Sequence, residues 1–163
     1  MAQDGATAAR QDLLEQVRDV LKAVRLLKHQ LPPAQAGVPV GTFGVLAAIA
    51  RAESGTACHS KELAAECALD PSTISRAVAA LVRAGLVQRT ADPADGRASV
   101  LELTPLGRRK LTDVVRSYDD LLADALRDWT APELTALAGL FQRFSHDLIT
   151  RVQNPTQTLE AAR

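Results

Sequence analysis

The 163-residue sequence has few aromatic residues and no long apolar run. Aromatic residues make up 3% of the chain, whereas apolar residues as a whole make up 47%. The core must therefore be built mainly from Ala, Leu and Val, which favours packed helices over an aromatic-rich β-sandwich. No run of 18 apolar residues occurs, so we expect no membrane-spanning helix. The first twenty residues lack a basic segment followed by a continuous apolar stretch, so we expect no secretory signal either.

Chemistry-bearing residues are also scarce. The two cysteines, Cys58 and Cys67, are too few and too close for a disulfide scaffold, so a reducing cytoplasm is the expected compartment. Cys58, His59 and Cys67 could offer metal ligands, but no carboxylate and no further pair of histidines lies at the sequence spacing of a metal site. We therefore do not expect these residues to bind a metal. The three histidines accompany no nucleophile elbow, phosphate loop or paired carboxylates. We therefore expect neither an enzyme nor a bound cofactor.

The formal net charge is +0, but charge is sorted along the chain. Residues 71–91 carry three arginines and no acid, whereas residues 111–149 carry seven acids against three arginines, a net charge of −4. This distribution predicts one module with positive potential and another with negative potential. Chance segregation on an ordinary solvated surface is the alternative.

The N-terminal part predicts a long helix with one apolar seam. Its apolar residues alternate at spacings of four and three, the heptad pattern of a helix that packs lengthwise on another helix. They are Leu13, Val17, Val20, Val24, Leu27 and Leu31. Pro32 and Pro33 end this helix, and we expect residues 1–9 to form a disordered arm.

Residues 60–85 predict two short helices joined by a tight turn. Ser60 is the expected N-cap of the first helix, and Asp70 that of the second, with Pro71 at its first position. Gly85 supplies the left-handed residue that ends the second helix. Four apolar residues at positions i, i+4, i+7 and i+8 mark its buried stripe: Ile74, Val78, Leu81 and Val82.

The opposite face of the second helix carries small hydroxyl residues and arginine but no acid. An ordinary solvated face would carry Glu and Lys. Small side chains let the helix approach base edges in a DNA major groove, and arginine can bond to guanine O6 and N7 or to a phosphate. The candidates are Ser72, Thr73, Ser75 and Arg76. Two packed helices in a neutral bundle are the alternative interpretation.

A β-hairpin is predicted directly after these helices. Residues 86–90 and 99–103 are rich in branched aliphatic residues, and the segment between them has turn chemistry. Arg97, held extended by Asp95, would suit a narrow minor groove. Taken alone, an exposed turn ion pair worth about 0–1 kcal/mol would be the simpler interpretation.

The segments DPSTISRAVAALVRAGLVQR and DPADGRASVLELTPLG resemble the MarR family of winged helix-turn-helix transcription regulators, and the likeness covers roughly residues 12–152. The family pattern is D-x-S-T-x-x-R-x-x-x-x-L-x-x-x-G-L-V-x-R, then D-x-R and L-T-x-x-G. One departure is Gly96, where the family often has a second basic residue, which would weaken the hairpin contact or make it more flexible. Fourteen positions match: Asp70, Ser72, Thr73, Arg76, Leu81, Gly85, Leu86, Val87, Arg89, Asp95, Arg97, Leu103, Thr104 and Gly107.

The resemblance implies specific DNA contacts. The recognition-helix residues would contact bases in the major groove, and Arg97, oriented by Asp95, would enter the minor groove. The candidate phosphate contacts are Ser60, Lys61, Arg83 and Arg89. The family binds pseudo-palindromic DNA as a homodimer through its N- and C-terminal helices, so half-sites are expected about 10–10.5 bp apart.

The resemblance also implies a regulatory effector. Family members commonly bind small aromatic or phenolic molecules, and repression is their commonest mode of action. We expect Arg25, His29 and Phe43 to line the effector site. Two alternatives stay open: a thiol-based redox sensor and a helical interaction module without DNA binding. Redox members usually keep their sensing cysteine near the start of the first helix, where this chain has none.

The expected fold is mainly α with a small β-hairpin wing: a winged helix-turn-helix domain plus a helical dimerisation region. We assign residues 37–104 to the DNA-binding domain, 10–36 and 105–152 to the dimerisation region, and 153–163 to a flexible tail. Cys67 lies on the apolar stripe of its helix and is expected to be buried, whereas Cys58 in the preceding loop would be the more reactive thiol.

Overall fold

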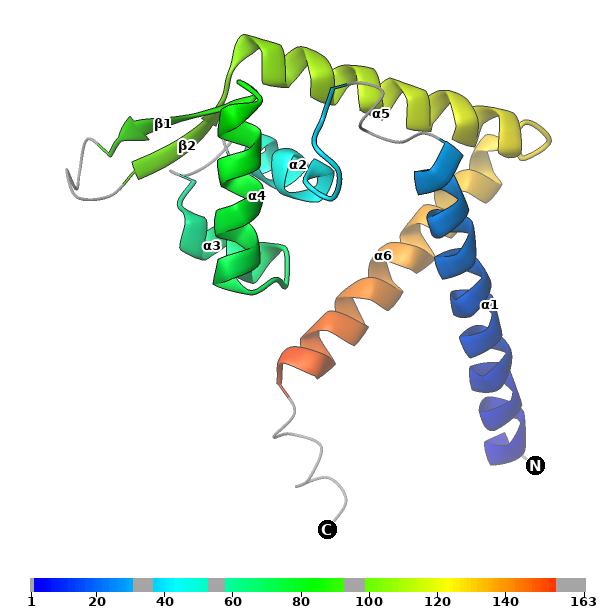
Figure 1. The fold of residues 1–163 in the computed structure, drawn as a ribbon. Helices are drawn as coiled ribbons and strands as arrows, with labels where there is room; N and C mark the ends of the chain where they lie inside the picture. The colour runs from blue at the N-terminus through cyan, green and yellow to red at the C-terminus, as the bar shows by residue number, and fades with distance from the viewer. Residues whose placement is uncertain (1, 31–36, 53–57, 93–98, 155–163) are drawn as a thin grey trace. The chain divides into compact units, whose positions relative to one another are not determined.

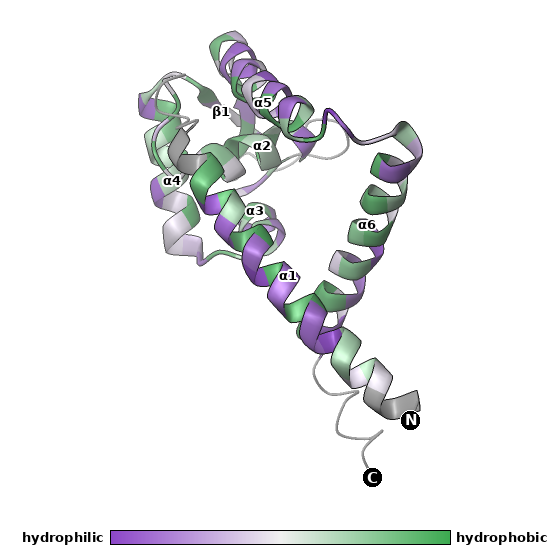
Figure 2. Ribbon diagram, turned by 90° about the vertical axis from the view of Figure 1, so that its right-hand side faces the viewer, coloured by the Kyte–Doolittle hydropathy of each residue, from purple (hydrophilic) through white to green (hydrophobic). Residues whose placement is uncertain are grey.

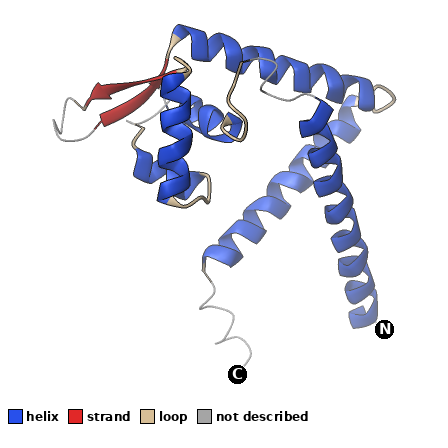
Figure 3. Ribbon diagram, in the orientation of Figure 1, coloured by secondary structure: helices blue, strands red, loops and turns tan. Residues whose placement is uncertain are grey.

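The computed structural model describes residues 2–30, 37–52, 58–92 and 99–154 (Figure 1). The chain divides into two units, residues 1–120 and 121–163. The elements follow in the order α1 Ala2–Gln30, α2 Phe43–Ala52, α3 Ser60–Glu66, α4 Pro71–Arg83, β1 Val87–Ala91, β2 Ser99–Leu103, α5 Pro105–Ala125 and α6 Ala131–Gln153. In the described residues the helices are accompanied by a two-stranded hairpin, as the sequence predicts (Figure 3). None of the helices described has the length and hydropathy that a membrane crossing needs.

The core of the first unit lies where α2, α3 and α4 meet the hairpin. Ile74, Val78 and Leu81 of α4 are fully buried, as their spacing predicts. Val82 is 37% exposed, and Ala77 takes a place in the core that the predicted stripe did not include. The buried residues are therefore spaced i, i+3, i+4 and i+7, so the buried stripe is turned toward Ala77 and away from Val82.

The hairpin is antiparallel, with Val87 opposite Leu103 and Ala91 opposite Ser99. Val87, Leu101 and Leu103 are buried, so one face of the hairpin closes the core. On the other face, Gln88 Nε2 donates to Glu102 Oε2 at 3.0 Å. The backbone N–H of Leu101 also donates to the carbonyl of Cys58 at 2.9 Å, so the chain before α3 pairs along the outer edge of β2.

Two predicted boundaries are wrong. Residues 2–9, expected to be a disordered arm, belong to α1, because four alanines in this stretch give it high helix propensity. Ser60 is the first helical residue of α3, and His59 takes the N-cap position without a side-chain cap bond. Asp70 is the N-cap residue of α4 with Pro71 after it, as predicted, but its carboxylate makes no cap bond.

The seam of α1 is largely exposed in the single chain. Leu13, Val20 and Val24 are 45%, 40% and 41% exposed, although heptad spacing places them on one face. Apolar residues also run along α6, which buries none of its side chains (Figure 2). Each of these helices therefore carries an apolar face that the described part of the protomer leaves in solvent.

Candidate nucleic-acid interface

The acid-free face of α4 is exposed. Ser72, Ser75 and Arg76 lie open to solvent, and Thr73 is half-buried. The guanidinium of Arg76 lies over the first turn of its own helix, where Nε donates to the Ser72 carbonyl at 3.3 Å and a terminal nitrogen donates to Thr73 Oγ1 at 3.4 Å. Bonds this long on an exposed side chain are weak, so Arg76 can turn toward an outside acceptor at small cost.

The end of α4 is fixed by a Schellman motif. Gly85 has φ +69°, and its N–H donates to the Val82 carbonyl at 2.9 Å. The N–H of Leu86 donates to the Leu81 carbonyl at 3.0 Å, and both leucines are buried. These two bonds satisfy carbonyls at the helix end and set the direction in which the chain enters β1.

Thr104 connects the end of the hairpin to the end of α4. Its hydroxyl donates to the Gly85 carbonyl at 2.6 Å and accepts the Gly107 N–H at 3.0 Å, while its own N–H donates to the Leu86 carbonyl at 3.0 Å. One side chain thus caps α5 and holds the turn that follows α4. The sequence predicts that Thr104 and Pro105 open a long helix, but it does not indicate the bond from Thr104 to Gly85.

Gly107 allows α5 to pack directly on the chain after α4. A Cβ atom on Gly107 would collide with the carbonyl oxygen of Leu86 and lie 2.9 Å from its carbonyl carbon. Only glycine fits this close approach. We call Thr104 and Gly107, with Gly85 and Leu86, the α4–α5 junction; it connects the end of α4, the end of the hairpin and the start of α5.

The other predicted DNA contacts occupy the same unit. Ser60 and Lys61 are exposed in the first turn of α3, Arg83 is exposed at the end of α4, and Arg89 is exposed on β1. Helix α4 contacts both α3 and β1, so these elements form one packed body. Asp95 and Arg97 lie outside the described residues. The residues that flank their segment, Asp92 and Ser99, both contact His59, which sequence reasoning did not single out for this role.

Comparison with known proteins agrees with this geometry. Residues 36–98 match the model of the MarR family. A stretch of 89 residues, 55% of this chain, is 36% identical to the uncharacterised HTH-type transcriptional regulator YxaD of Bacillus subtilis (strain 168). The apo form of wild-type MarR from E. coli has 26% identity and a TM-score of 0.63, with 81% of this chain and 93% of that one covered. Residues 36–98 thus form a segment of the MarR family type.

A second solved MarR-like structure extends the comparison. PcaV of Streptomyces coelicolor, in complex with its natural ligand, has 25% identity and a TM-score of 0.60, with 80% of this chain and 89% of that one covered. The MarR family consists of transcriptional regulators, not of enzymes. The match to YxaD spans 62% of that relative's length.

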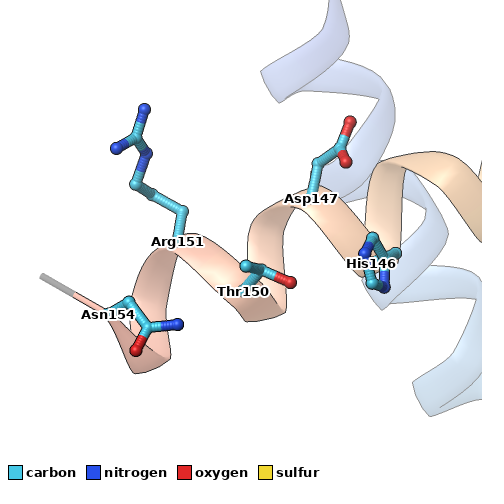
Figure 4. A pocket seen from close by; sticks show the side chains of 5 residues that line it. All are labelled: His146, Asp147, Thr150, Arg151 and Asn154. Atoms are coloured by element: carbon cyan, nitrogen blue, oxygen red, sulfur yellow. The ribbon is translucent and has the colours of Figure 1, made fainter. Parts of the chain in front are cut away.

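Two of the three predicted effector residues make contacts within the protein itself. Arg25 Nε donates to the Leu21 carbonyl of its own helix at 3.2 Å. Phe43 stacks on Tyr118 of α5, with ring centroids 5.7 Å apart and a tilt of 54°. The side chain of His29 lies outside the described residues. A hollow on the last turns of α6, shown in Figure 4, contains none of the three and is lined by His146, Asp147, Thr150, Arg151 and Asn154 of that single helix.

The predicted environments of the two cysteines are reversed in the structure. Cys58 is 3% exposed, because its pairing with β2 turns the side chain into the core, whereas Cys67 is half-buried. The pKa of Cys67 is raised by burial and by the charge of Glu66, against a smaller opposing effect of Arg51. A raised pKa leaves little thiolate at neutral pH, which argues against a thiol sensor at this position. Within the described residues, no three metal-ligating side chains gather.

Proposed function

We propose that this protein is a DNA-binding transcriptional regulator that recognises a pseudo-palindromic operator as a homodimer. The observation that carries the proposal is the exposed, acid-free face of α4, on which Ser72, Ser75 and Arg76 face solvent. The similarity of residues 36–98 to a family of transcriptional regulators supports it. We assign DNA binding to residues 37–104.

In the proposed complex, α4 lies in the major groove. Arg76 bonds to guanine O6 and N7, while Ser72, Thr73 and Ser75 permit close approach of the helix to the bases. Arg97, oriented by Asp95, enters the adjacent minor groove. Phosphate contacts position the complex, and we assign them to four exposed side chains, Ser60, Lys61, Arg83 and Arg89.

The homodimer is proposed from the apolar faces of α1 and α6. Burial of apolar area contributes about 25 cal/mol per Å², so a second copy that covers both faces would stabilise the pair substantially. Residues 10–36 and 105–152 would form the dimerisation region. Val20→Asp combined with Val24→Asp would place charge on the α1 seam, and sedimentation equilibrium should then show monomers. An unchanged dimer would exclude this seam from the interface.

We further propose that the regulator is a repressor and that a small aromatic or phenolic effector releases it from DNA. PcaV, a similar structure, contains its natural ligand, which supports ligand control here. Effector binding would favour a dimer whose recognition helices do not fit both half-sites. Salicylate is a suitable first probe. If Arg25→Ala, Phe43→Ala and His29→Ala all kept the wild-type response to an active effector, this assignment of residues would be wrong.

The function is tested by selecting duplexes from a random 30-bp library and titrating the enriched sequence by fluorescence anisotropy. Two inverted half-sites about 10–10.5 bp apart are expected. Affinity should fall with salt with a log–log slope near −0.9 per phosphate contact. A duplex with one half-site scrambled should bind far more weakly. No enrichment would instead favour a helical interaction module without DNA binding.

A further inference from the structure

Asp70 places a carboxylate beside the exposed, acid-free face of α4. The residue is exposed and directly precedes Pro71, and Ser72 of that face follows two residues later. Its backbone is extended, with φ −61° and ψ 144°, so Asp70 lies just outside the helix at its N-terminal end. Because α4 itself contains no acid, Asp70 is the negative charge that adjoins the proposed DNA-binding face.

The start of α4 has little need of this carboxylate as a cap. An N-cap side chain accepts from N–H groups of the first turn that lack another partner. Pro71 has no N–H, and the N–H groups of Thr73 and Ile74 donate to the carbonyl oxygen of Asp70 at 2.9 and 3.0 Å. Of the first four helical residues, that leaves Ser72, and the carboxylate makes no cap bond. The carboxylate is therefore available to a donor outside the protein.

The charged side chains that flank Asp70 in the sequence have other partners. Glu66, the last residue of α3, accepts from Arg51 of α2, with 2.8 Å between the terminal guanidinium nitrogen and Oε1. Arg76 lies over the first turn of α4 and donates there to a backbone carbonyl and a threonine hydroxyl. In the free protein the charge of Asp70 thus faces solvent.

A carboxylate in this place opposes DNA binding unless it accepts a hydrogen bond from a base. It is repelled by the phosphates that approach the same surface. In the major groove the donors are the amino groups at cytosine N4 and adenine N6. Adenine presents its N7 acceptor next to that amino group, which suits an amide better than a carboxylate, whereas cytosine presents a donor alone. The chemistry of Asp70 therefore fits cytosine.

We propose that Asp70 determines base specificity by accepting a hydrogen bond from cytosine N4 in each half-site. The proposal rests on the proposed function and deepens it, because Asp70 reaches a base only when α4 lies in the major groove. The same carboxylate lowers affinity for every duplex that does not offer the amino group, since its repulsion of phosphates is then not compensated. Asp70 thus raises the ratio of specific to non-specific affinity.

Asp70→Asn is the sharpest test, because asparagine is as good an N-cap as aspartate and nearly the same size. Affinities are measured for the selected duplex and for every single-base variant of it. The wild type should bind about tenfold more weakly when one cytosine of the half-site is replaced, and Asp70→Asn should prefer adenine at that position. An unchanged base preference in Asp70→Asn, or the loss of an adenine preference instead of a cytosine preference, would overturn the proposal.

A scrambled duplex at low salt separates the charge from base recognition. Asp70→Asn and Asp70→Ala should bind it about two- to fivefold more tightly than the wild type, and the gain should shrink as salt rises. Asp113→Asn is the matched control, because it removes an exposed acid from α5. The control should change neither this affinity nor the base preference. An equal gain in Asp113→Asn would mean that net charge alone matters and would refute the role of Asp70.

Urea unfolding excludes a merely structural effect. Asp70→Asn should unfold at the wild-type urea concentration, so that its altered base preference is not a consequence of lost stability. If the random library yields no enriched duplex, the proposed function fails. If a duplex is enriched and bound, but Asp70→Asn reads it as the wild type does, the role of Asp70 alone fails.

Discussion

Replacement of Gly107 by alanine tests the α4–α5 junction most sharply. The new Cβ would lie 2.9 Å from the Leu86 carbonyl carbon and closer still to its oxygen. Carbon atoms pack best at about 3.5–4.0 Å, so the methyl group is about 0.6 Å too close even to the carbon. Because the contact is with backbone on both sides, no side-chain rotation relieves it.

The magnitude follows from three effects. Overpacking of a close contact costs about 1–3 kcal/mol, and we expect the upper part of that range against backbone. Displacement of the Leu86 carbonyl also weakens its bond from the Thr104 N–H, which contributes about 1 kcal/mol. The higher helix propensity of alanine offsets about 1 kcal/mol of this loss in stability. The free energy of unfolding should therefore fall by about 2–3 kcal/mol, with a loss of roughly 4–12 °C in Tm.

Urea unfolding followed by circular dichroism measures this change, at one protein concentration because association raises apparent stability. Gly44→Ala is the matched control: Gly44 is helical, lies in the same unit, and a Cβ there meets no atom within 4 Å. The control should be neutral or more stable by up to about 1 kcal/mol. If Gly107→Ala were as stable as Gly44→Ala, the close packing of α5 on Leu86 would be refuted.

Three further outcomes are expected. Thr104→Val should lower the free energy of unfolding by about 1–2 kcal/mol in the same assay, because the bonds to Gly85 and Gly107 are lost, and Thr104→Ser should restore most of it. Iodoacetamide should modify Cys67 more slowly than free cysteine at pH 7, as measured by mass spectrometry, because its pKa is raised; faster modification would contradict the structure. The hydroxyl and N–H of Thr130 lower the pKa of Glu133, so their stabilisation is present above the ordinary carboxyl range and lost on acidification; an NMR titration of Thr130→Val should show the pKa of Glu133 raised toward its usual value.

Helices and the hairpin were predictable because local signals and burial agree. Pro71 after Asp70 and the left-handed Gly85 mark the ends of α4, and the spacing of Ile74, Val78 and Leu81 marks its buried face. Thr130 and Glu133 likewise predict the start of α6 as a capping box, and both bonds of Glu133 to Thr130 are present. In these elements the residues that set the ends and the buried face lie within one short stretch of sequence.

Features that depend on distant contacts were not predictable. Cys58 looked like a loop thiol, but pairing with Leu101, far along the chain, buries it. His59 contacts Asp92 and Ser99, and no local pattern indicates these contacts. The prediction that residues 1–9 form a disordered arm was wrong for another reason. Their small size was taken as a sign of disorder, whereas the alanines among them favour a helix.

The central claim is that the exposed face of α4 recognises bases, and Arg76→Ala tests it most directly. Its affinity for the selected duplex and for every single-base variant should be compared with that of Arg143→Ala, which removes an exposed arginine from α6. Arg76→Ala alone should lose about 1–3 kcal/mol of binding free energy and should no longer distinguish guanine at one position of each half-site. Wild-type affinity with an unchanged base preference would contradict it.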